Sequence, residues 1–499
     1  MRLVILLSAS MQRRWHEELV GRMRNEVSAD TTVRLVADAP TSAHRRLQSL
    51  LRWERMLNGV KPGGLERGRL TRTAPRDDDE HPDIVLDLTS SPAEGHWRVL
   101  YDGRPGEQAA VDALRSGRQP IVSVVDASGR VRAVGRPGSD LPGLMTTSLA
   151  DLGAGVSSLV VGAVLGSPFA AILPDDSTSA DGAGHGERPR SFAVIAVRRL
   201  IGAVLRLGYR IGFRSPHWRV GWRRLDGPDS LALGALATTG WQDIPDDGYH
   251  FYADPFPFEH EGRLVLFVED WDHRQQKAVI SAVEWGQDGP EGTPRPVLSH
   301  DVHLSYPFVI AHAGEVWMIP ESSNARTLEL YRAVSFPWRW ERHSVLLEGM
   351  EISDATPFLL DGRWWMTATV GYGGSLSDSL CLWSAPELWG PWTPHAHNPV
   401  LVDIASSRPA GRVEIREGRV LRSFQDGRGG YGAAMGTAEI TRIDDEGFEQ
   451  RIISEIRPGE GWTGTRVHTL NAAGGIETID GTRRVLRFVR RRTMPSARL

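Results

Sequence analysis

The chain has 499 residues, of which 40% are hydrophobic and 24% are charged, which is typical of globular proteins. At roughly 150 residues per domain, this length predicts two to four domains. The net charge of −4 argues against a bulk nucleic-acid binder, and the single cysteine excludes an internal disulfide or a multi-cysteine metal site.

The first part of the chain predicts an α/β, Rossmann-like domain over residues 1–172, because short β-branched runs alternate with helix-forming stretches. The apolar run at residues 3–7 is shorter than the roughly 7–15 residues of a signal peptide, so we expect a buried first strand there. No G-x-G-x-x-G follows that strand and no G-x-x-x-x-G-K-[ST] occurs, so we expect no nucleotide. We also expect no other cofactor, and no metal because no His/Asp cluster has the spacing of a catalytic metal site. The expected elements are a helix over 11–25 and strands at 2–7, 33–36, 84–88 and 121–125.

This region resembles the formyltransferase-like domains that are found ahead of sugar-related modules. The resemblance implies one candidate function, that of a sugar-modifying formyl- or glycosyltransferase. The Asn, His and Asp constellation that such transferases use is not recognisable in these residues.

Residues 173–216 are predicted to connect two domains. Their first part, 174–190, is polar and glycine-rich, as linkers are. An amphipathic helix follows, with Arg199, Arg206, Arg210 and Arg214 along one face. Such a helix can lie on an anionic membrane or pack its apolar face on a neighbouring domain, and we favour packing. No uninterrupted run of about 18 apolar residues occurs, so no ordinary transmembrane helix is expected, and 192–213 is the nearest candidate.

The second part, residues 217–492, contains an internal repeat of roughly 50 residues, a length typical of four-stranded propeller blades. Each unit opens on an x-Pro pair and continues through an Asp-Gly, Glu-Gly or Ala-Gly turn into a second strand. A short strand at 220–224 precedes the first unit and is expected to complete the last blade. The pairs are Asp254-Pro255, Tyr306-Pro307, Thr356-Pro357 and Arg408-Pro409, with a degenerate fifth unit at Arg466-Val467-His468.

These features predict a five-bladed β-propeller. Most of the 17 tryptophans follow residue 215, and we expect the majority of them to pack between blades.

The propeller geometry predicts a cluster of carboxylates at one mouth of the central channel. First strands line the channel, and second strands return to the same face. Glu269 follows Asp254 by the same interval as Glu321 follows Tyr306, and Asp354 lies two residues before Thr356. Crowded carboxylates raise one another's pKa, and pairs with different protonation states can act as general acid and base. The full set expected at this mouth is Asp254, Glu269, Glu321, Asp354 and Asp426, with Arg408 among them.

The motifs Ala253-Asp254-Pro255-Phe256 and Asp354 resemble those of the five-bladed propeller glycosidases, the arabinanase/xylosidase and invertase/levansucrase superfamily. The resemblance implies that Asp254 is a base or nucleophile and Asp354 a modulator. Those glycosidases carry the general acid as a glutamate in blade four; here Glu321 is the better-placed substitute.

A second resemblance is to the N-terminal propeller of plant glucosamine inositolphosphorylceramide transferases. It is carried by the segment from His250 to Phe256, by Pro320-Glu321-Ser322, and by Gln425-Asp426 with Tyr431-Gly432. In those transferases the transfer chemistry is attributed to a separate C-terminal domain. This resemblance therefore leaves open a non-catalytic module that binds a glycan or glycolipid.

The leading hypothesis is a glycosidase-like protein that acts on a glycan or glycoconjugate, with Asp254, Glu321 and Asp354 as catalytic residues. The expected partner is a carbohydrate or glycolipid, not nucleic acid, and the expected location is cytoplasmic, with membrane association through residues 191–214 left open. Predicted substrate-binding residues are Glu269, Trp271, Tyr306, Arg408, Gln425, Asp426, Tyr431 and His468.

Overall fold

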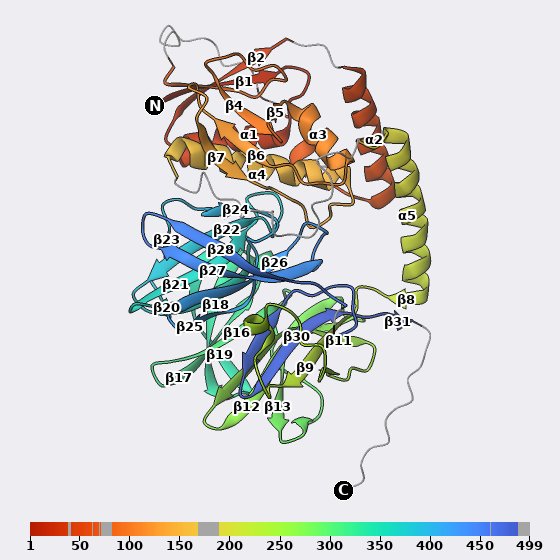
Figure 1. The fold of residues 1–499 in the computed structure, drawn as a ribbon, viewed down its shortest axis with the longest axis vertical. Helices are drawn as coiled ribbons and strands as arrows, with labels where there is room; N and C mark the ends of the chain where they lie inside the picture. Colours follow the sequence, from red (N-terminus) through yellow and green to blue (C-terminus); the bar gives the residue numbers. More distant parts are fainter. Residues whose placement is uncertain are drawn as a thin grey trace.

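The computed structural model describes residues 1–37, 41–61, 63–68, 70, 82–167, 189–459 and 461–487. It contains an α/β domain that is followed by a five-bladed propeller, and a long helix runs along one side of both (Figure 1). Most of the linker predicted at 174–190 lies outside the described residues.

The N-terminal domain is built on a mixed sheet with strand order β2-β1-β3-β4-β6-β7. The first four strands of this order are parallel, whereas β6 and β7 continue antiparallel, so the sheet is only partly of the expected parallel type. The Rossmann-like assignment therefore stays a prediction. The strands are β1 (Arg2–Ser8), β2 (Asp30–Val36), β3 (Ile84–Asp87), β4 (Trp97–Tyr101), β5 (Arg104–Pro105), β6 (Val122–Val125) and β7 (Val131–Gly135).

The helices of this half differ sharply in burial. They are α1 (Arg14–Asn25), α2 (Ser42–Asn58), α3 (Glu107–Arg115), α4 (Met145–Leu165) and α5 (Phe192–Gly212). By length and hydropathy α4 could cross a membrane, but 83% of its apolar window is buried inside the fold. Among the described helices, α4 and not the segment 192–213 is therefore the long apolar one, and its burial is that of a core helix.

The propeller confirms the five predicted blades. Its four-stranded sheets follow one another around the ring, and short strands β15 and β24 add to blades 1 and 3. Blade 1 holds β11 (His250–His260), β12 (Arg263–Asp272), β13 (Lys277–Gly286), β14 (Gly289–Pro290) and β15 (Arg295–Leu298). Blade 2 holds β16 (Ser305–His312), β17 (Glu315–Glu321), β18 (Thr327–Ser335) and β19 (Arg339–Glu348). Blade 3 holds β20 (Ile352–Leu360), β21 (Arg363–Val370), β22 (Ser379–Ala385), β23 (Thr393–Pro394) and β24 (Leu401–Val402).

Blade 4 holds β25 (Pro409–Arg416), β26 (Arg419–Asp426), β27 (Ala434–Ile443) and β28 (Phe448–Ile456). Blade 5 joins the two ends of the propeller, because β29 (Leu470–Ala473) and β30 (Ile476–Thr482) pair onward with β9 (Trp218–Arg224) and β10 (Gln242–Asp243). The closing strand predicted at 220–224 is therefore confirmed.

The hairpin between first and second strands has the same backbone in blades 1 to 4. Glu261, Ala313, Asp361 and Glu417 have φ of 50–52°, and the glycine that follows each of them also has positive φ. Two successive left-handed residues form the type I′ turn, whose twist matches that of antiparallel strands. The predicted x-Gly turn signals thus set the register of four blades.

The N-terminal domain sits on the propeller through α4 and the loop before it (Figure 1). Arg136 and Asp403 form a buried ion pair, with 2.9 Å between Nε and Oδ1. The backbone N–H of Gly138 donates to Asp378 at 3.1 Å, and burial raises the pKa of Asp378 to about 8. A Cβ on Gly374 would lie 2.6 Å from Ala154 of α4, so this glycine lets blade 3 approach the helix closely.

Candidate functional site

The first strands of blades 1, 2 and 3 share a bulge that organises the channel mouth. Asp254, Tyr306 and Asp354 each have left-handed backbone, with φ of 48°, 44° and 54°, and the pairing register shifts at each of them. A bulge leaves its extra residue outside the regular ladder. Asp354, and not Thr356 of the x-Pro pair, is therefore the structural counterpart of Asp254, which corrects the predicted alignment of blade 3.

Each bulge N–H finds a carboxylate as its acceptor. Asp254 N donates to Asp480 at 2.9 Å, Tyr306 N to Asp254 at 3.1 Å, and Asp354 N to Glu321 at 3.0 Å. Buried backbone donors need such partners, because an unpaired N–H is costly away from water. The acids at the mouth therefore hold the blades in register as well as facing the channel.

Glu269 and Glu321 occupy the same position at the ends of the second strands. Glu269 lies opposite Ala253 and Glu321 lies opposite Ser305, each one residue before the bulge. Blade 3 has Thr369 at this position, opposite Ser353. The predicted convergence of blade 1 and blade 2 acids on one face thus follows from the shared register.

Asp254 and Glu269 form the first carboxyl pair, and they share a side-chain hydrogen bond. Asp254 also accepts from the Thr469 hydroxyl at 2.7 Å. Burial, together with the charges of Asp254 and Glu321, raises the pKa of Glu269 well above its ordinary value. Burial also raises the pKa of Asp254, against the lowering effect of His468. The pair therefore holds a proton at a pH where an exposed carboxyl would have lost it.

His468 lies beside this pair. Its Nδ1 is 2.5 Å from Asp480 and its Nε2 is 3.9 Å from Asp254. Burial alone would lower the pKa of His468, but the two carboxylates outweigh it and raise the pKa. Trp218 stacks on the imidazole at a centroid distance of 4.1 Å and fixes its plane.

Asp254, His468 and Asp480 are also the residues that could hold a metal ion, since their ligand atoms lie within 4.8 Å of one another. Asp480 already accepts hydrogen bonds from three backbone N–H groups, those of Asp254, His468 and Thr469. The imidazole Nδ1 faces Asp480 and the raised pKa favours its protonated form, which cannot bind a cation. The arrangement fits a self-satisfied hydrogen-bond network better than a metal centre.

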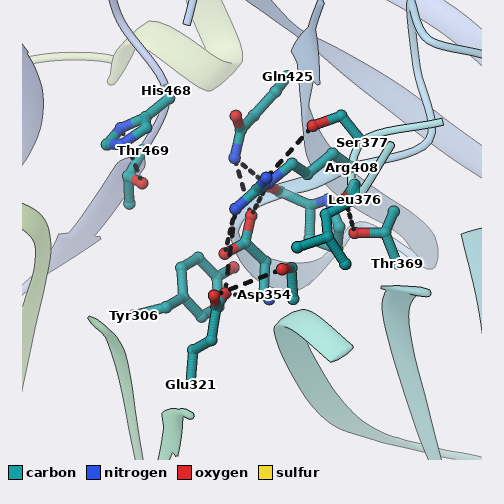
Figure 2. A network of polar contacts seen from close by, with 12 residues as sticks. Tyr306, Glu321, Asp354, Thr369, Leu376, Ser377, Arg408, Gln425, His468 and Thr469 are labelled. Atoms are coloured by element: carbon teal, nitrogen blue, oxygen red, sulfur yellow. Dashed lines mark hydrogen bonds and ion pairs between the residues drawn. The ribbon is translucent and has the colours of Figure 1, made fainter. Parts of the chain in front are cut away.

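The second carboxyl pair, Glu321 and Asp354, is built around an arginine (Figure 2). Arg408 Nε lies 2.6 Å from Asp354, and its Nη2 lies 3.9 Å from Glu321. Gln425 also points at Asp354 and donates to it at 2.8 Å. Burial raises the pKa of Asp354 to about 7, although the Arg408 charge opposes the shift. Glu321 accepts two further hydrogen bonds, from the hydroxyls of Ser323 and Ser353.

The N-terminal domain reaches this second pair through one aspartate. Asp140 accepts hydrogen bonds from Ser375 at 3.1 Å and Ser377 at 2.5 Å. Ser377 in turn accepts from Arg408 at 3.2 Å (Figure 2). The backbone carbonyl of Asp140 accepts from the N–H of Tyr431, whose ring lies 5.0 Å from the Arg408 guanidinium. The two domains thus build the mouth together.

A cleft of about 1040 Å³ opens at this mouth. Its floor carries Asp254, Glu269, Glu321, Arg408 and His468, and its rim carries arginines from the end of α5 and from the chain end. Aromatic side chains form much of the wall, an arrangement suited to stacking on sugar rings. These aromatic residues are Trp218, Tyr249, Phe251, Trp271 and Tyr431.

Seven of the predicted site residues line this cleft, two lie directly behind it, and two lie elsewhere. Asp354 and Gln425 lie directly behind Arg408. Tyr306 is fully buried in the channel, where its hydroxyl bonds to Thr356 and Gly411. It is therefore placed to hold blades together and not to meet a substrate, because the hydrophobic first strand draws its side chain into the core.

Asp426 also differs from expectation. Its carboxylate binds the backbone and guanidinium of Arg428, two residues further on, and it is not among the residues that line the cleft. Asp426 is instead held by the adjacent turn, where a basic residue lies within reach of its carboxylate, and so it does not join the acids of the channel.

Among the residues that sequence reasoning missed, His303 lines the cleft, whereas Asp480 and Asp140 support it from behind. His303 lies 3.6 Å from Glu269, and its Nδ1 has no hydrogen-bond partner within the described part of the chain. Asp480 lies near the end of the second strand of the degenerate fifth blade. Comparison with the position of Glu269 in blade 1 could have identified it. Asp140 comes from the other domain, and no local pattern marks it.

Residues 240–477 match the family model "Glucosamine inositolphosphorylceramide transferase 1, N-terminal". A protein of that name from Oryza sativa subsp. japonica is 30% identical over 255 residues, which cover 48% of this chain and 34% of the relative. Its namesake from Arabidopsis thaliana is 30% identical over 249 residues, which cover 47% and 32%. The chain thus spans about a third of the length of the curated relatives it matches.

Solved propellers are more distant. Zg3597, a family 117 glycoside hydrolase of Zobellia galactanivorans, has 13% identity and a TM-score of 0.34, over 53% of this chain and 90% of that one. An alpha-L-arabinofuranosidase from Lactobacillus brevis has 11% identity and a TM-score of 0.33, over 42% and 80%.

Proposed function

We propose that the propeller is a carbohydrate-active module whose mouth receives a glycan or the sugar headgroup of a glycolipid. The family match covers the blades that build the cleft, and the relatives' name joins a sugar, glucosamine, to a lipid, inositolphosphorylceramide. Buried carboxyl groups can hydrogen-bond sugar hydroxyls while aromatic walls stack on the rings.

The observation that carries the proposal is the hydrogen-bonded pair of Asp254 and Glu269 on the floor of the cleft. A carboxyl group whose pKa is raised by burial and neighbouring carboxylates is suited to general acid catalysis. We assign the general acid to Glu269 in place of Glu321, because Glu321 already accepts hydrogen bonds from Asp354, Ser323 and Ser353. Asp254 accepts the hydrogen bond from protonated Glu269. Asp354 and Arg408 determine the charge next to this pair.

The alternative is a non-catalytic glycan-binding module, and one observation favours it. Glycosidase carboxyls flank the scissile bond at about 5–5.5 Å or 6.5–9.5 Å. Asp254 and Glu269 share a hydrogen bond, so no sugar atom fits between them. Hydrolysis would require Glu269 to turn towards the substrate and leave Asp254.

The test uses the full chain with a panel of aryl glycosides and a glycan array. Wild type is expected to turn over at least one aryl glycoside, and Glu269→Gln is expected to lower that rate by about 10²-fold or more, the usual contribution of a general acid. Asp254→Asn is expected to abolish turnover. Asp426→Asn is the matched control, because Asp426 is an equally buried acid that binds Arg428 away from the cleft.

Glycan binding without turnover, retained in Asp254→Asn, would assign the binding role and reject catalysis. Loss of glycan binding in Trp271→Ala, with folding intact, would place the ligand at the aromatic wall. Absence of both turnover and binding across the panel would reject a carbohydrate ligand for this cleft.

A further inference from the structure

Helix α5 presents a row of apolar side chains to the outside of the molecule. It stands along one edge of the structure, reaching from the N-terminal domain to the propeller (Figure 1). Eight apolar residues are between 45% and 67% exposed, although large apolar side chains at such exposure are normally scattered singly. They are Val194, Val197, Leu200, Ile201, Val204, Leu205, Leu207 and Ile211.

The opposite side of α5 faces the protein and is held there through Arg199 and Arg206. Arg199 lies 3.4 Å from Glu54 of α2, and Arg206 donates to Asn58 at 2.8 Å. Only Ile195 of the helix is buried, with Phe192 and Ala196 packed beside it on the N-terminal core. The expectation that the apolar face packs on a neighbouring domain is therefore wrong. Glu54 attracts Arg199 to the inner side, and this turns the apolar face outward.

The exposed face is long enough to be an interface. The helix has 21 residues, which at 1.5 Å per residue makes it about 31 Å long. Ordinary surface helices place their apolar stripe on the core and their charges in water, so an inverted helix marks a binding surface. The exposed residues span this length from the first turn to the last.

The charge around this face identifies the partner. Residues 189–225 contain no aspartate or glutamate, while Arg198, Arg206 and Arg210 are exposed on α5 itself. The chain end emerges beside the last turn, because β31 (Val485–Leu486) pairs with β8 (Phe213–Arg214).

We propose that α5 docks this protein on an anionic lipid surface, with its apolar face in the headgroup layer and its arginines near the phosphates. Cationic amphipathic helices bind membranes in this way, by buried apolar area together with electrostatic attraction. The arginines interrupt the apolar sequence, so the helix lies in the plane of the surface.

A second copy of the chain fits this face less well. Two α5 helices packed face to face would bring arginines together with no acid between residues 189 and 225 to neutralise them. Like charges across an interface disfavour association. An anionic lipid layer meets both the apolar and the positive parts of the surface.

The docking also orients the cleft. Arg210 and Arg214, at the end of α5, and Arg487, beside them, line the rim of the cleft that holds Asp254 and Glu269. A protein lying on α5 therefore opens this cleft next to the lipid headgroups. We infer that its ligand is the sugar headgroup of a membrane lipid, an inference that rests on the proposed function, whereas the docking itself does not.

The test is co-sedimentation of the full chain with vesicles. Wild type is expected to bind phosphatidylcholine vesicles containing phosphatidylglycerol, to bind pure phosphatidylcholine weakly, and to lose binding at high salt. The variant Ile201→Ser/Val204→Ser/Leu205→Ser is expected to bind about tenfold or more weakly. The matched control is Leu233→Ser/Ile415→Ser/Ile453→Ser, which removes similarly exposed apolar groups from the propeller and is expected to bind as wild type does.

Equal vesicle binding by wild type and the α5 variant would overturn the docking. So would a wild-type dimer, measured by sedimentation without lipid, that the α5 variant dissociates while neither protein binds vesicles. Binding of soluble glycans separates the two proposals, because the α5 variant is expected to retain it. Vesicle binding without any glycan binding would keep the docking and reject the cleft as a sugar site.

Discussion

The two carboxyl pairs at the channel mouth are built on the same backbone positions, yet their surroundings differ. Asp254 and Asp354 both occupy the left-handed bulge of a first strand, and Glu269 and Glu321 both end a second strand. The first pair faces His468 and no arginine within its hydrogen-bond shell, whereas Arg408 lies between the members of the second.

Both pairs include a carboxyl group whose pKa is raised, Glu269 in the first and Asp354 in the second, but only the second pair also binds an arginine. In the first pair, burial and the neighbouring carboxylates raise the pKa of Glu269. With Arg408 in place, Glu321 and Asp354 act as acceptors for an arginine, an amide and a backbone N–H. One repeated scaffold thus yields two kinds of acid site, and the neighbouring blade decides which.

The largest effect is expected for Arg408→Met, which removes the cation of the second pair. Breaking a buried ion pair from one side costs about 3–5 kcal/mol, because the remaining carboxylate stays buried without compensation. The free energy of unfolding, measured by urea denaturation, is expected to fall by this amount at pH 8. The loss is expected to be smaller at pH 5, where Asp354 takes up a proton.

Arg412→Met is the control for that experiment. Arg412 is partly buried, but it lies over the rings of Phe256 and Phe308 and its pKa is lowered to about 10 by burial. Its loss is expected to cost about 1–2 kcal/mol, in the range of a desolvated cation–π contact. Equal costs for the two variants would show that Arg408 is held by packing and not by the carboxyl pair.

Glu269→Gln is expected to have the next largest effect, and its sign depends on pH. The raised pKa means that folded Glu269 keeps a proton which the unfolded chain releases near its ordinary value of 4.5. Wild-type stability from this group is therefore greatest at low pH and is lost as the pH rises towards the raised pKa. Glutamine mimics the protonated form, so thermal unfolding should show a variant equal to wild type at pH 4 and more stable at pH 9.

The same substitution at Glu321 sharpens the comparison. Glu321→Gln replaces a carboxylate that accepts the Asp354 N–H with an amide that still offers one acceptor oxygen. A smaller gain at pH 9 is expected for it than for Glu269→Gln, because losing the Glu321 charge relieves Asp354 but also removes a partner of Arg408. Equal gains at high pH in both variants would mean that Arg408 does not distinguish the two pairs.

Asp140→Asn is expected to have a smaller effect, because it acts on the second pair through Ser377. Weakening a hydrogen bond to a charged group costs about 1–2 kcal/mol. Differential scanning calorimetry is expected to show this loss, and soluble-glycan affinity should fall because Ser377, which accepts from Arg408, loses its charged partner. Unchanged affinity with lowered stability would limit Asp140 to joining the domains.

The smallest effect is expected for Asp426→Asn. Asp426 bonds to Arg428 outside both pairs, and Arg428 keeps its second partner, Glu455, when Asp426 is neutralised. Glycan binding measured by calorimetry should match that of wild type. A clear loss of binding would show that Asp426 belongs to the binding site.

Much of the propeller was predictable because its signals are local. The x-Gly pairs specify type I′ turns within two residues, and the alternation of each strand specifies its faces. The x-Pro motif placed Asp254 and Arg408 correctly, but it misled in blade 3. There the bulge begins at Asp354, three residues before the proline, since bulge position is set by pairing with the second strand.

The site was predictable in outline but not in its contacts. Seven predicted residues line the cleft, because a propeller brings equivalent strand ends to one face whatever their side chains. Which acid meets Arg408 and which meets His468 depends on neighbours from other blades, at sequence separations of 54 and more than 200 residues. No periodicity carries that information.

By itself, the sequence determined the five blades, the closing strand and the amphipathic character of α5, because turns, alternation and helical spacing act over a few residues. Only the tertiary structure decided that apolar α4 is buried and that less apolar α5 turns its apolar face outward. All apolar surfaces of the chain compete for the same limited interior. Helix α4 is buried because it covers both the sheet and the propeller, whereas in α5 the ion pair with Glu54 places Arg199 on the inner side. The same long-range competition placed His468 beside one carboxyl pair and Arg408 beside the other.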